Sequence, residues 1–327
     1  MLPISVPPVP YGATAVRPDW ADLPAALRDA ITARIGVPVT AAVTAGGGFT
    51  RGFAAVLTAA DGDRVFVKAA SRSDQPHVAD WYAREAAITA ILPAVVPAPR
   101  LRWTLDAAGH TVVCFDAIDG RMPRLPWAPD DLDATLTAWA TAAAALREPP
   151  AELLRVGLPT LADLLRADLS WWGEIVAGRE ALPAVPSHAA ARLAELAALE
   201  AALPAYATGG GVIHCDLRLD NVLIDGGGAA WICDWNWPCL GPAWFDTAGL
   251  LVTAYASGLD ADALFAAHPT ARDAPADALD ATLAALCGHW LTRSAAGATD
   301  ASPHLRAHAR WSGGIALTWL SARRGWS

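Results

Sequence analysis

Some residue types are almost missing from this chain. Of its 327 residues, lysine occurs once, at Lys68, and asparagine twice, at Asn221 and Asn236. The other 23 of its 24 basic residues are arginines. Because arginine is used almost everywhere else, a position that keeps lysine or asparagine is a candidate for a chemical requirement. Chance is the alternative, so the surroundings of each position must decide.

Long hydrophobic runs are missing as well. No apolar stretch approaches the ~20 residues of a membrane-spanning helix. Residues 1–12 contain neither a charged leader nor a long apolar segment. Acidic residues outnumber basic ones by 33 to 24, which argues against a surface that neutralises nucleic-acid phosphates. We therefore expect a soluble cytoplasmic protein, a monomer or homodimer, that binds neither membranes nor nucleic acids.

The cysteines form no metal-binding or disulfide pattern. They are scattered, and no two of them have CxxC spacing. An odd number of separated cysteines is typical of unpaired thiols in a reducing compartment, rather than of a disulfide framework or a zinc site. The five residues are Cys114, Cys215, Cys233, Cys239 and Cys287.

The first part of the chain alternates between turn signals and short β-type runs. Residues 1–18 are rich in proline and predict an extended arm, and residues 22–35 predict a helix that ends at Gly36. A second helix is predicted over Val78–Leu92. The predicted strands are Val39–Thr44, Gly52–Ala59, Arg64–Lys68, Leu101–Leu105 and Thr111–Phe115.

The rest of the chain has mostly helical patterns, interrupted by one β-rich segment. This segment, residues 212–234, contains predicted strands at Asn221–Ile224 and Ala229–Cys233. The predicted helices cover residues 130–145, 160–176, 188–203 and about 246 to the end. We therefore expect an α+β fold with three parts. These are an N-terminal arm and helix (1–36), a small antiparallel β-rich N-lobe (37–118) and a larger helical C-lobe (119–327).

Polar residues with a specific spacing surround the two strands of the β-rich segment. His214, Asp216 and Asn221 have the spacing HxDxxxxN, and Asp234 follows the next strand. Phosphoryl transfer needs a carboxylate that takes the proton of the acceptor hydroxyl, and oxygen ligands for magnesium. Asp216 suits the first role, whereas Asn221 and Asp234 suit the second. The alternative is a pair of surface turns with ordinary capping residues.

Lys68 has a potential partner on the following predicted helix. Glu85 shares a helical face with Trp81 and Ile88, and a carboxylate on such an apolar face needs a partner. A lysine–glutamate pair that holds nucleotide phosphates is typical of the small lobe of a kinase. The alternative is that Lys68 is a charge at a strand edge and that Glu85 pairs with Arg84 or with solvent.

A glycine-rich segment, residues 46–52, joins the first two predicted strands. Its glycines, Gly47 and Gly48 among them, would let backbone N–H groups approach phosphates, and Thr50 would offer a hydroxyl. The segment lacks both the GxGxxG pattern and the GK[ST] ending of a Walker A loop. A plain β-hairpin turn explains it equally well.

Together, these residues resemble the aminoglycoside phosphotransferase family, which has a two-lobed protein-kinase-like fold. The resemblance rests on Lys68, Glu85, the HxDxxxxN motif and Asp234, and it covers about residues 37–250. The segment CDWNWPCLGPAWFD, residues 233–246, is similar to the metal-binding stretch of that family. Protein kinases have Asp-Phe-Gly where this chain has Asp-Trp-Asn, which favours a small-molecule kinase.

The resemblance implies ATP and Mg²⁺ as cofactors and a role for each site residue. Asp216 would be the base, Asn221 and Asp234 would hold Mg²⁺, and Lys68 would bind ATP phosphates, with Glu85 orienting it. Further implied residues are His214 and Asp246, which would brace the catalytic loop, and the hinge of Phe115, Asp116, Ala117 and Ile118, whose backbone would contact adenine.

Two residues depart from the family pattern. Cys215 stands where the family often has glycine, and Arg218 stands where many members have histidine. Arg218 would either neutralise charge near the transferred phosphoryl group or pair with Asp220, and we favour the pairing. Neither residue is a direct ligand in this interpretation, so the departures concern the detail of the loop rather than the reaction.

The acceptor is expected to be a hydroxyl of a small molecule that binds in the C-lobe. A polycationic aminoglycoside needs acidic residues, whereas the alternative is an ordinary acidic surface. An apolar or sugar-bearing acceptor would suit tryptophans such as Trp235 and Trp237. An antibiotic and a choline-, homoserine- or sugar-like metabolite remain open, and a pseudokinase is the less favoured alternative. The acidic candidates are Asp260, Asp262, Asp273, Asp277, Asp280 and Asp300.

Overall fold

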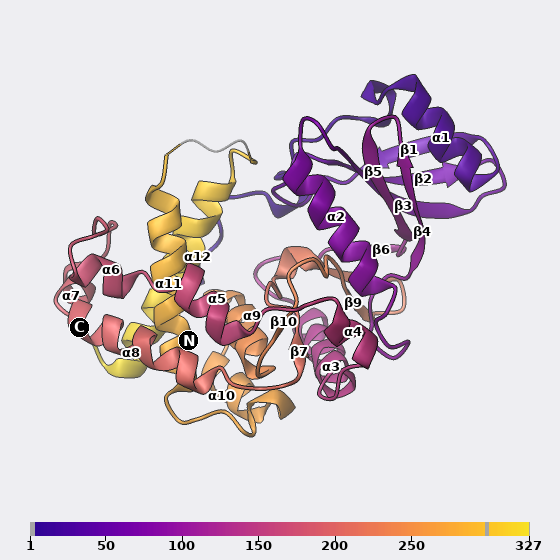
Figure 1. The fold of residues 1–327 in the computed structure, drawn as a ribbon. Coiled ribbons are helices and arrows are strands. Elements are labelled where there is room, and N and C mark those ends of the chain that lie inside the picture. Colours follow the sequence, from indigo (N-terminus) through magenta and orange to yellow (C-terminus); the bar gives the residue numbers. More distant parts are fainter. Residues whose placement is uncertain (1–3, 298–300, 327) are drawn as a thin grey trace.

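The protein has two lobes, as seen in a computed structural model that describes residues 4–297 and 301–326 (Figure 1). The N-lobe contains an antiparallel sheet with the strand order β1-β2-β3-β5-β4. Its strands are β1 (Val39–Thr44), β2 (Phe53–Ala59), β3 (Arg64–Ser71), β4 (Leu101–Ala107) and β5 (His110–Asp116). The predicted α+β class, with a β-rich N-lobe before a helical C-lobe, is confirmed.

Two helices pack on opposite faces of this sheet, α1 (Ala25–Ile35) and α2 (Pro76–Thr89). Side chains alternate along a strand, so β3 presents Val67 to the face of α1 and Phe66 to the face of α2. Lys68 has the same parity as Phe66 and therefore lies on the α2 face. The alternation explains how the only lysine of the chain comes to face this helix.

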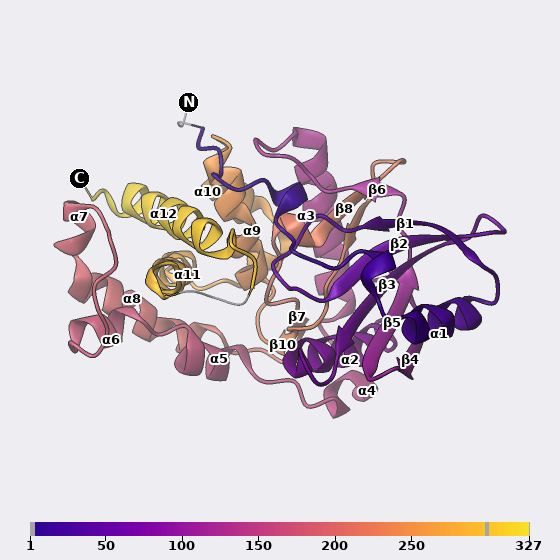
Figure 2. The same ribbon diagram turned by 90° about the horizontal axis from the view of Figure 1, so that it is seen from above.

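The C-lobe consists mainly of helices around one large core. The last two, α11 and α12, lie side by side (Figures 1 and 2). The two helices approach closely at Gly313 of α12, where a Cβ atom would lie only 2.8 Å from Leu291 of α11. The helices are α3 (Pro129–Ala145), α4 (Ala151–Arg155), α5 (Leu161–Asp168), α6 (Trp172–Val176), α7 (Ser187–Ala190), α8 (Leu193–Tyr206), α9 (Trp244–Ala256), α10 (Ala261–Ala267), α11 (Ala278–Ala295) and α12 (Leu305–Arg324).

Two small sheets lie where the lobes meet. One has the order β6-β8-β9, formed by β6 (Gly120–Arg121), β8 (Val222–Asp225) and β9 (Ala230–Ile232). The other pairs β7 (Val212–Ile213) with β10 (Cys239–Leu240). The segments that contain His214, Asp216 and Asp234 follow β7 and β9, so these sheets position the candidate site.

Several predicted elements differ from the observed ones. The helix predicted over residues 160–176 is two helices, α5 and α6, because the buried Glu200 accepts hydrogen bonds from the backbone N–H groups of Trp171, Trp172 and Gly173 at the start of α6. The helix predicted over residues 188–203 is likewise divided into α7 and α8. Strand β3 continues past Lys68 to Ser71, and the β7–β10 pairing was not predicted.

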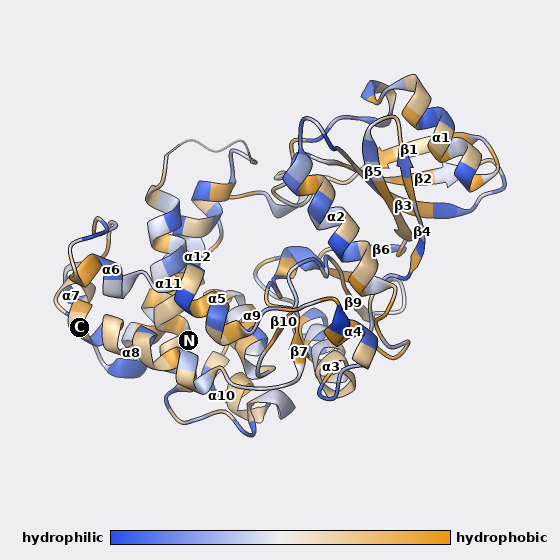
Figure 3. Cartoon of the chain, viewed as in Figure 1, coloured by the Kyte–Doolittle hydropathy of each residue, from blue (hydrophilic) through white to orange (hydrophobic). Residues whose placement is uncertain are grey.

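Hydrophilic and hydrophobic residues share most helices, as Figure 3 shows for α2 and α12. This distribution is typical of helices that cover a core on one side only. None of the helices in the described ranges is both long and apolar enough to cross a membrane.

Candidate active site

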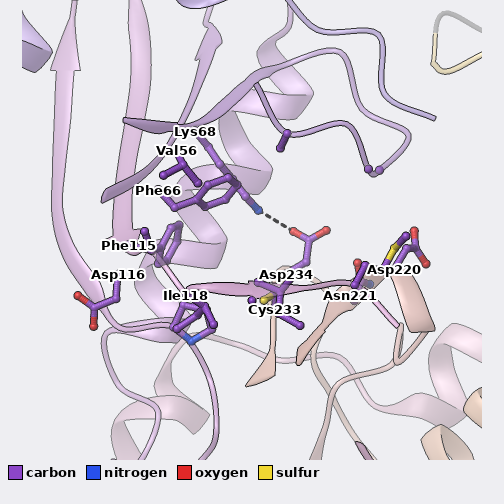
Figure 4. A pocket seen from close by; sticks show the side chains of 18 of the residues that line it. Val56, Phe66, Lys68, Phe115, Asp116, Ile118, Asp220, Asn221, Cys233 and Asp234 are labelled. Carbon is purple, nitrogen blue, oxygen red and sulfur yellow. Dashed lines mark hydrogen bonds and ion pairs between the residues drawn. The ribbon is translucent and has the colours of Figure 1, made fainter. Parts of the chain in front are cut away.

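A cavity of about 380 Å³ lies between the lobes and contains most of the residues that the sequence singles out. Figure 4 shows its lining, with side chains from the N-lobe sheet above and from the β8–β9 region below. Lys68, Glu85, Asn221 and Asp234 all line it. The fold therefore brings together residues that are up to 166 positions apart in the sequence.

Lys68 lies at the centre and joins the two lobes. Its Nζ donates to both carboxylate oxygens of Glu85, at 2.9 and 2.7 Å, and to Oδ1 of Asp234 at 2.9 Å (Figure 4). Burial alone would lower the pKa of Lys68, but the two carboxylates outweigh it and raise that pKa. The pKa of Asp234 is lowered, because the attraction of Lys68 outweighs the effect of burial. Asp234 is therefore ionised at neutral pH.

Asp216 lies between two side chains that orient it. Its Oδ1 accepts a hydrogen bond from Nη1 of Arg218 at 2.5 Å, and its Oδ2 accepts one from Nδ2 of Asn221 at 3.2 Å. Arg218 also donates two hydrogen bonds to Asp220, at 2.9 and 2.8 Å. Burial raises the pKa of Asp216 to about 6, against the opposing effect of Arg218. The carboxylate is ionised at neutral pH and is able to accept a proton.

His214 braces the loop that contains Asp216. A carbonyl oxygen only accepts, so the 2.8 Å contact with Cys233 O assigns the proton to Nε2 of His214. Its Nδ1 then accepts the backbone N–H of Asp216 at 3.3 Å. The backbone N–H of His214 donates to Oδ2 of Asp246 at 2.7 Å. Burial lowers the pKa of His214 to about 4, so the ring is neutral and holds the backbone rather than a reacting atom.

Two residues of the site have a backbone conformation that favours glycine. Cys215 and Asp234 both have a φ of 65°. For a residue other than glycine this left-handed region costs about 1–3 kcal/mol, which the surrounding contacts must offset. The backbone N–H of Cys215 donates to Oδ2 of Asp246 at 3.2 Å, and the side chain of Asp234 is held by Lys68. The strain lies at the two loops that present the polar groups.

The opposite end of the cavity is apolar. Val56 and Phe66 are cross-strand partners in β2 and β3, and both line it (Figure 4). All four predicted hinge residues, Phe115 to Ile118, also line the cavity. Oδ1 of Asp116 accepts a hydrogen bond from Nε of Arg102 at 2.7 Å, and the backbone N–H of Asp116 donates to Arg100 O at 2.9 Å.

The glycine-rich segment covers the cavity only in part. Gly47 and Gly48 line it, whereas Thr50 is not among the lining residues. Phe49 turns instead toward the C-lobe, where its ring lies 5.6 Å from the Arg218 guanidinium and 5.0 Å from the His308 ring. The tip of this loop therefore contacts the arginine that orients Asp216.

The sequence matches a family model over most of its length. The model describes a phosphotransferase enzyme family, and it matches residues 45–291. The chain belongs to this phosphotransferase family. The resemblance to aminoglycoside phosphotransferases is thus confirmed. No sequence among curated proteins matches the chain.

Solved structures of phosphotransferases have the same fold. An aminoglycoside phosphotransferase in a ternary complex with AMP-PNP and hygromycin B is 14% identical, with a TM-score of 0.62 over 91% of this chain and 99% of that one. A macrolide 2′-phosphotransferase from Brachybacterium faecium is 16% identical, with a TM-score of 0.54 over 88% and 97%. An aminoglycoside phosphotransferase from Alicyclobacillus acidocaldarius is 17% identical, with a TM-score of 0.53 over 88% and 92%.

The predictions from the sequence did not include some of the residues that line the cavity of this phosphotransferase. Phe66 could have been found, because it lies two residues before Lys68 on the same predicted strand; Val56 shares that face because it is the cross-strand partner of Phe66. Gly12 and Arg17 come from the N-terminal arm and also line the cavity. Nothing in the proline-rich composition of the arm indicates this position, since it depends on contacts between distant segments.

Most of the acidic residues considered for the acceptor site already bind other groups of the protein or are exposed. Asp262 and Asp280 both form ion pairs with Arg323, and Asp260 accepts the backbone N–H of Ala263 as a helix cap. Asp273 and Asp277 are exposed, and Asp300 lies outside the described residues.

The two tryptophans beside Asp234 differ in position. Trp235 is buried and packs edge-on against His214, with ring centroids 4.7 Å apart. Trp237 is 46% exposed and packs against Trp81 of α2 at 5.3 Å. Of the two, Trp237 alone presents an accessible aromatic surface.

The strain at Cys215 gives a test of the loop geometry. Because glycine adopts positive φ without strain, Cys215→Gly should be more stable than Cys215→Ala by about 1 kcal/mol. At Cys287, inside α11, the order should reverse, with Cys287→Gly less stable than Cys287→Ala by about 1 kcal/mol. Urea denaturation of the four variants measures both differences. A Cys215→Ala variant at least as stable as Cys215→Gly would contradict the observed conformation.

Proposed function

We propose that this protein transfers the terminal phosphoryl group of ATP, bound with Mg²⁺, to a hydroxyl group of a small molecule. The observation that carries the proposal is the contact of Lys68 with both Glu85 and Asp234 at the cavity between the lobes. A lysine–glutamate pair beside an ionised metal-binding aspartate is the arrangement that kinases use for nucleotide phosphates.

The two ends of the cavity suit the two ends of a nucleotide. Its apolar end, with Val56 and Phe66, would hold adenine, and the backbone of Phe115 to Ile118 would offer hydrogen bonds to its edge. The phosphates would then extend toward Lys68. A protein of similar fold forms a complex with AMP-PNP, which supports a nucleotide as ligand.

The residues present fit a magnesium ion. Asp234 uses only Oδ1 for Lys68, and Asn221 uses its Nδ2 for Asp216, so one carboxylate oxygen and one amide oxygen remain as hard ligands. The described residues contain no cluster of three or more His, Cys, Asp or Glu side chains arranged for a metal. That matches Mg²⁺, which takes its other ligands from phosphates and water. Asn221 and Asp234 would hold the ion, which would neutralise negative charge on the phosphates.

Asp216 would act as the base. The acceptor hydroxyl oxygen attacks the terminal phosphorus, its proton passes to a carboxylate oxygen of Asp216, and ADP leaves. Arg218 holds Oδ1 of Asp216 and so fixes the direction of the other oxygen. Asp246 holds the backbone N–H groups of His214 and Cys215, and the ring of His214 holds that of Asp216. The presence of base, metal ligands and lysine argues against a pseudokinase.

The acceptor is proposed at the level of class, a hydroxyl-bearing small molecule. Aminoglycoside and macrolide phosphotransferases of similar fold support an antibiotic and hence a role in resistance. The pairing of Asp262 and Asp280 with Arg323 counts against a strongly acidic pocket for a polycation in that region. A choline-, homoserine- or sugar-like metabolite is the alternative. ATP as donor implies a cytoplasmic enzyme.

The reaction is tested by ADP release from Mg·ATP across a panel of acceptors. The panel contains aminoglycosides, macrolides, choline, homoserine and simple sugars, and the Asp216→Asn variant is the blank. We expect release with one acceptor class and a loss of at least about 100-fold in the variant, because general-base catalysis contributes that much. ATP affinity of the variant should stay near that of the wild type. Equal turnover in the variant would contradict the role of Asp216.

The metal role is tested by ATP affinity with Mg²⁺ and with EDTA. We expect Asp234→Ala to lose most of the increase in affinity that Mg²⁺ provides, because the variant lacks the carboxylate ligand. The matched control is Asp29→Ala, which removes an exposed carboxylate on α1. An Asp234→Ala variant with the same Mg²⁺ dependence as the control would refute the assignment.

A further inference from the structure

The N-terminal arm, residues 4–18 in the structure, runs from the C-lobe to the N-lobe (Figure 2), and its Gly12 and Arg17 line the cavity. On the C-lobe, the backbone N–H of Ser5 donates to Ala256 O at 2.8 Å, and the hydroxyl of Tyr11 contacts Nδ1 of His308 at 2.7 Å. On the N-lobe, the backbone N–H of Ala15 donates to Gly46 O at 2.8 Å. The arm is therefore part of the folded cleft.

The three successive glycines of the loop are in close contact with this arm. A Cβ atom at Gly46 would lie 2.1 Å from the carbonyl oxygen of Gly12, and one at Gly47 would lie 3.2 Å from that of Tyr11. Gly48 has a φ of 97°, and its Cβ atom would lie 2.8 Å from Nη2 of Arg17. Because these glycines have no side chains, the arm, and Arg17 in particular, can pack directly against the backbone of the loop.

Arg17 lines the cavity and joins the two sides of the glycine-rich loop. Its Nη1 donates to Gly52 O at 2.9 Å, and its Nη2 donates to Gly47 O at 3.1 Å. Its Nε is buried and has no hydrogen-bond partner. Two of the five guanidinium N–H groups are thus used and Nε–H is enclosed by protein, so one N–H on Nη1 and one on Nη2 remain for a ligand.

Arg17 differs from Lys68, the other cation that lines the cavity, in its charged partners. The cations that line it are Arg17 and Lys68. Lys68 is neutralised by Glu85 and Asp234. Within the described ranges, Arg17 has no carboxylate at ion-pair distance, and its hydrogen bonds go to uncharged carbonyl groups. Arg17 therefore contributes a positive charge that forms no ion pair, although burial raises the pKa of Glu85 and Arg17 lies near enough to that carboxyl to oppose the rise.

We propose that Arg17 binds the phosphate groups of the nucleotide, as a second cation beside Lys68. The inference rests on the proposed function, since it assumes a nucleotide in this cavity. A guanidinium presents several donors in one plane and matches phosphate oxygens well. The residue lies outside residues 45–291, where the family model matches, so the arm adds a ligand that the matched region does not contain.

The test compares the affinities of the full-length protein for adenosine, ADP and ATP in the presence of Mg²⁺, measured by calorimetry. We expect Arg17→Gln to weaken ADP and ATP binding by about tenfold or more, the range of a lost hydrogen bond between charged groups. Adenosine, which has no phosphate, should bind with an affinity within about twofold of the wild type. Arg17→Lys should be intermediate, because it keeps the charge but not the planar donors.

The matched control is Arg51→Gln, which removes an exposed arginine of the same loop that does not line the cavity. This control should leave all three affinities unchanged. Equal losses for adenosine and ATP in Arg17→Gln would mean that Arg17 only holds the loop, and unchanged ATP affinity would mean that it does not touch the phosphates. Either result overturns the inference. A wild-type protein that binds neither ADP nor ATP would overturn the proposed function as well.

Discussion

The cleft depends on one buried ammonium group with carboxylate partners in both lobes. A buried charge is stable only when it is paired and hydrogen-bonded, and removal of one partner typically costs about 3–5 kcal/mol. Lys68 has Glu85 on one side and Asp234 on the other, within 2.9 Å. Strand β3 must therefore face α2, and the loop after β9 must bring Asp234 within hydrogen-bond distance of Lys68. The other polar groups of the site are placed relative to this contact.

Much of this arrangement could be predicted from the sequence, because it follows from local periodicity and from residue chemistry. The strands of the N-lobe, the position of Glu85 on an apolar helix face and the HxDxxxxN motif are all local signals. The division of residues 160–176 could not be predicted, because it depends on Glu200, a buried carboxylate from a distant helix that caps α6. The contribution of the arm was missed for the same reason. Its contacts join segments about 300 positions apart.

The glycines of the glycine-rich loop have two structural reasons, of which the sequence indicated one. Its glycines suggest an approach of backbone to phosphates, and Gly47 and Gly48 do line the cavity. They are also required for the close approach of the arm, which a side chain at Gly46 would block. The loop thus has one side toward the cavity and one toward residues 11–17. Phe49 at its tip extends this contact to Arg218, so the loop, the arm and the segment that contains Asp216 and Arg218 lie in contact.

The unique lysine allows a direct test of the central claim, that this cleft is a nucleotide site. An acyl phosphate derivative of ATP transfers its acyl group to a lysine amine beside the bound phosphates, and Lys68 is the only lysine of this chain. Mass spectrometry should find the label on the peptide that contains Lys68, and an excess of Mg·ATP should prevent it. A peptide that stays unlabelled, or one that is labelled equally with and without ATP, would contradict the account.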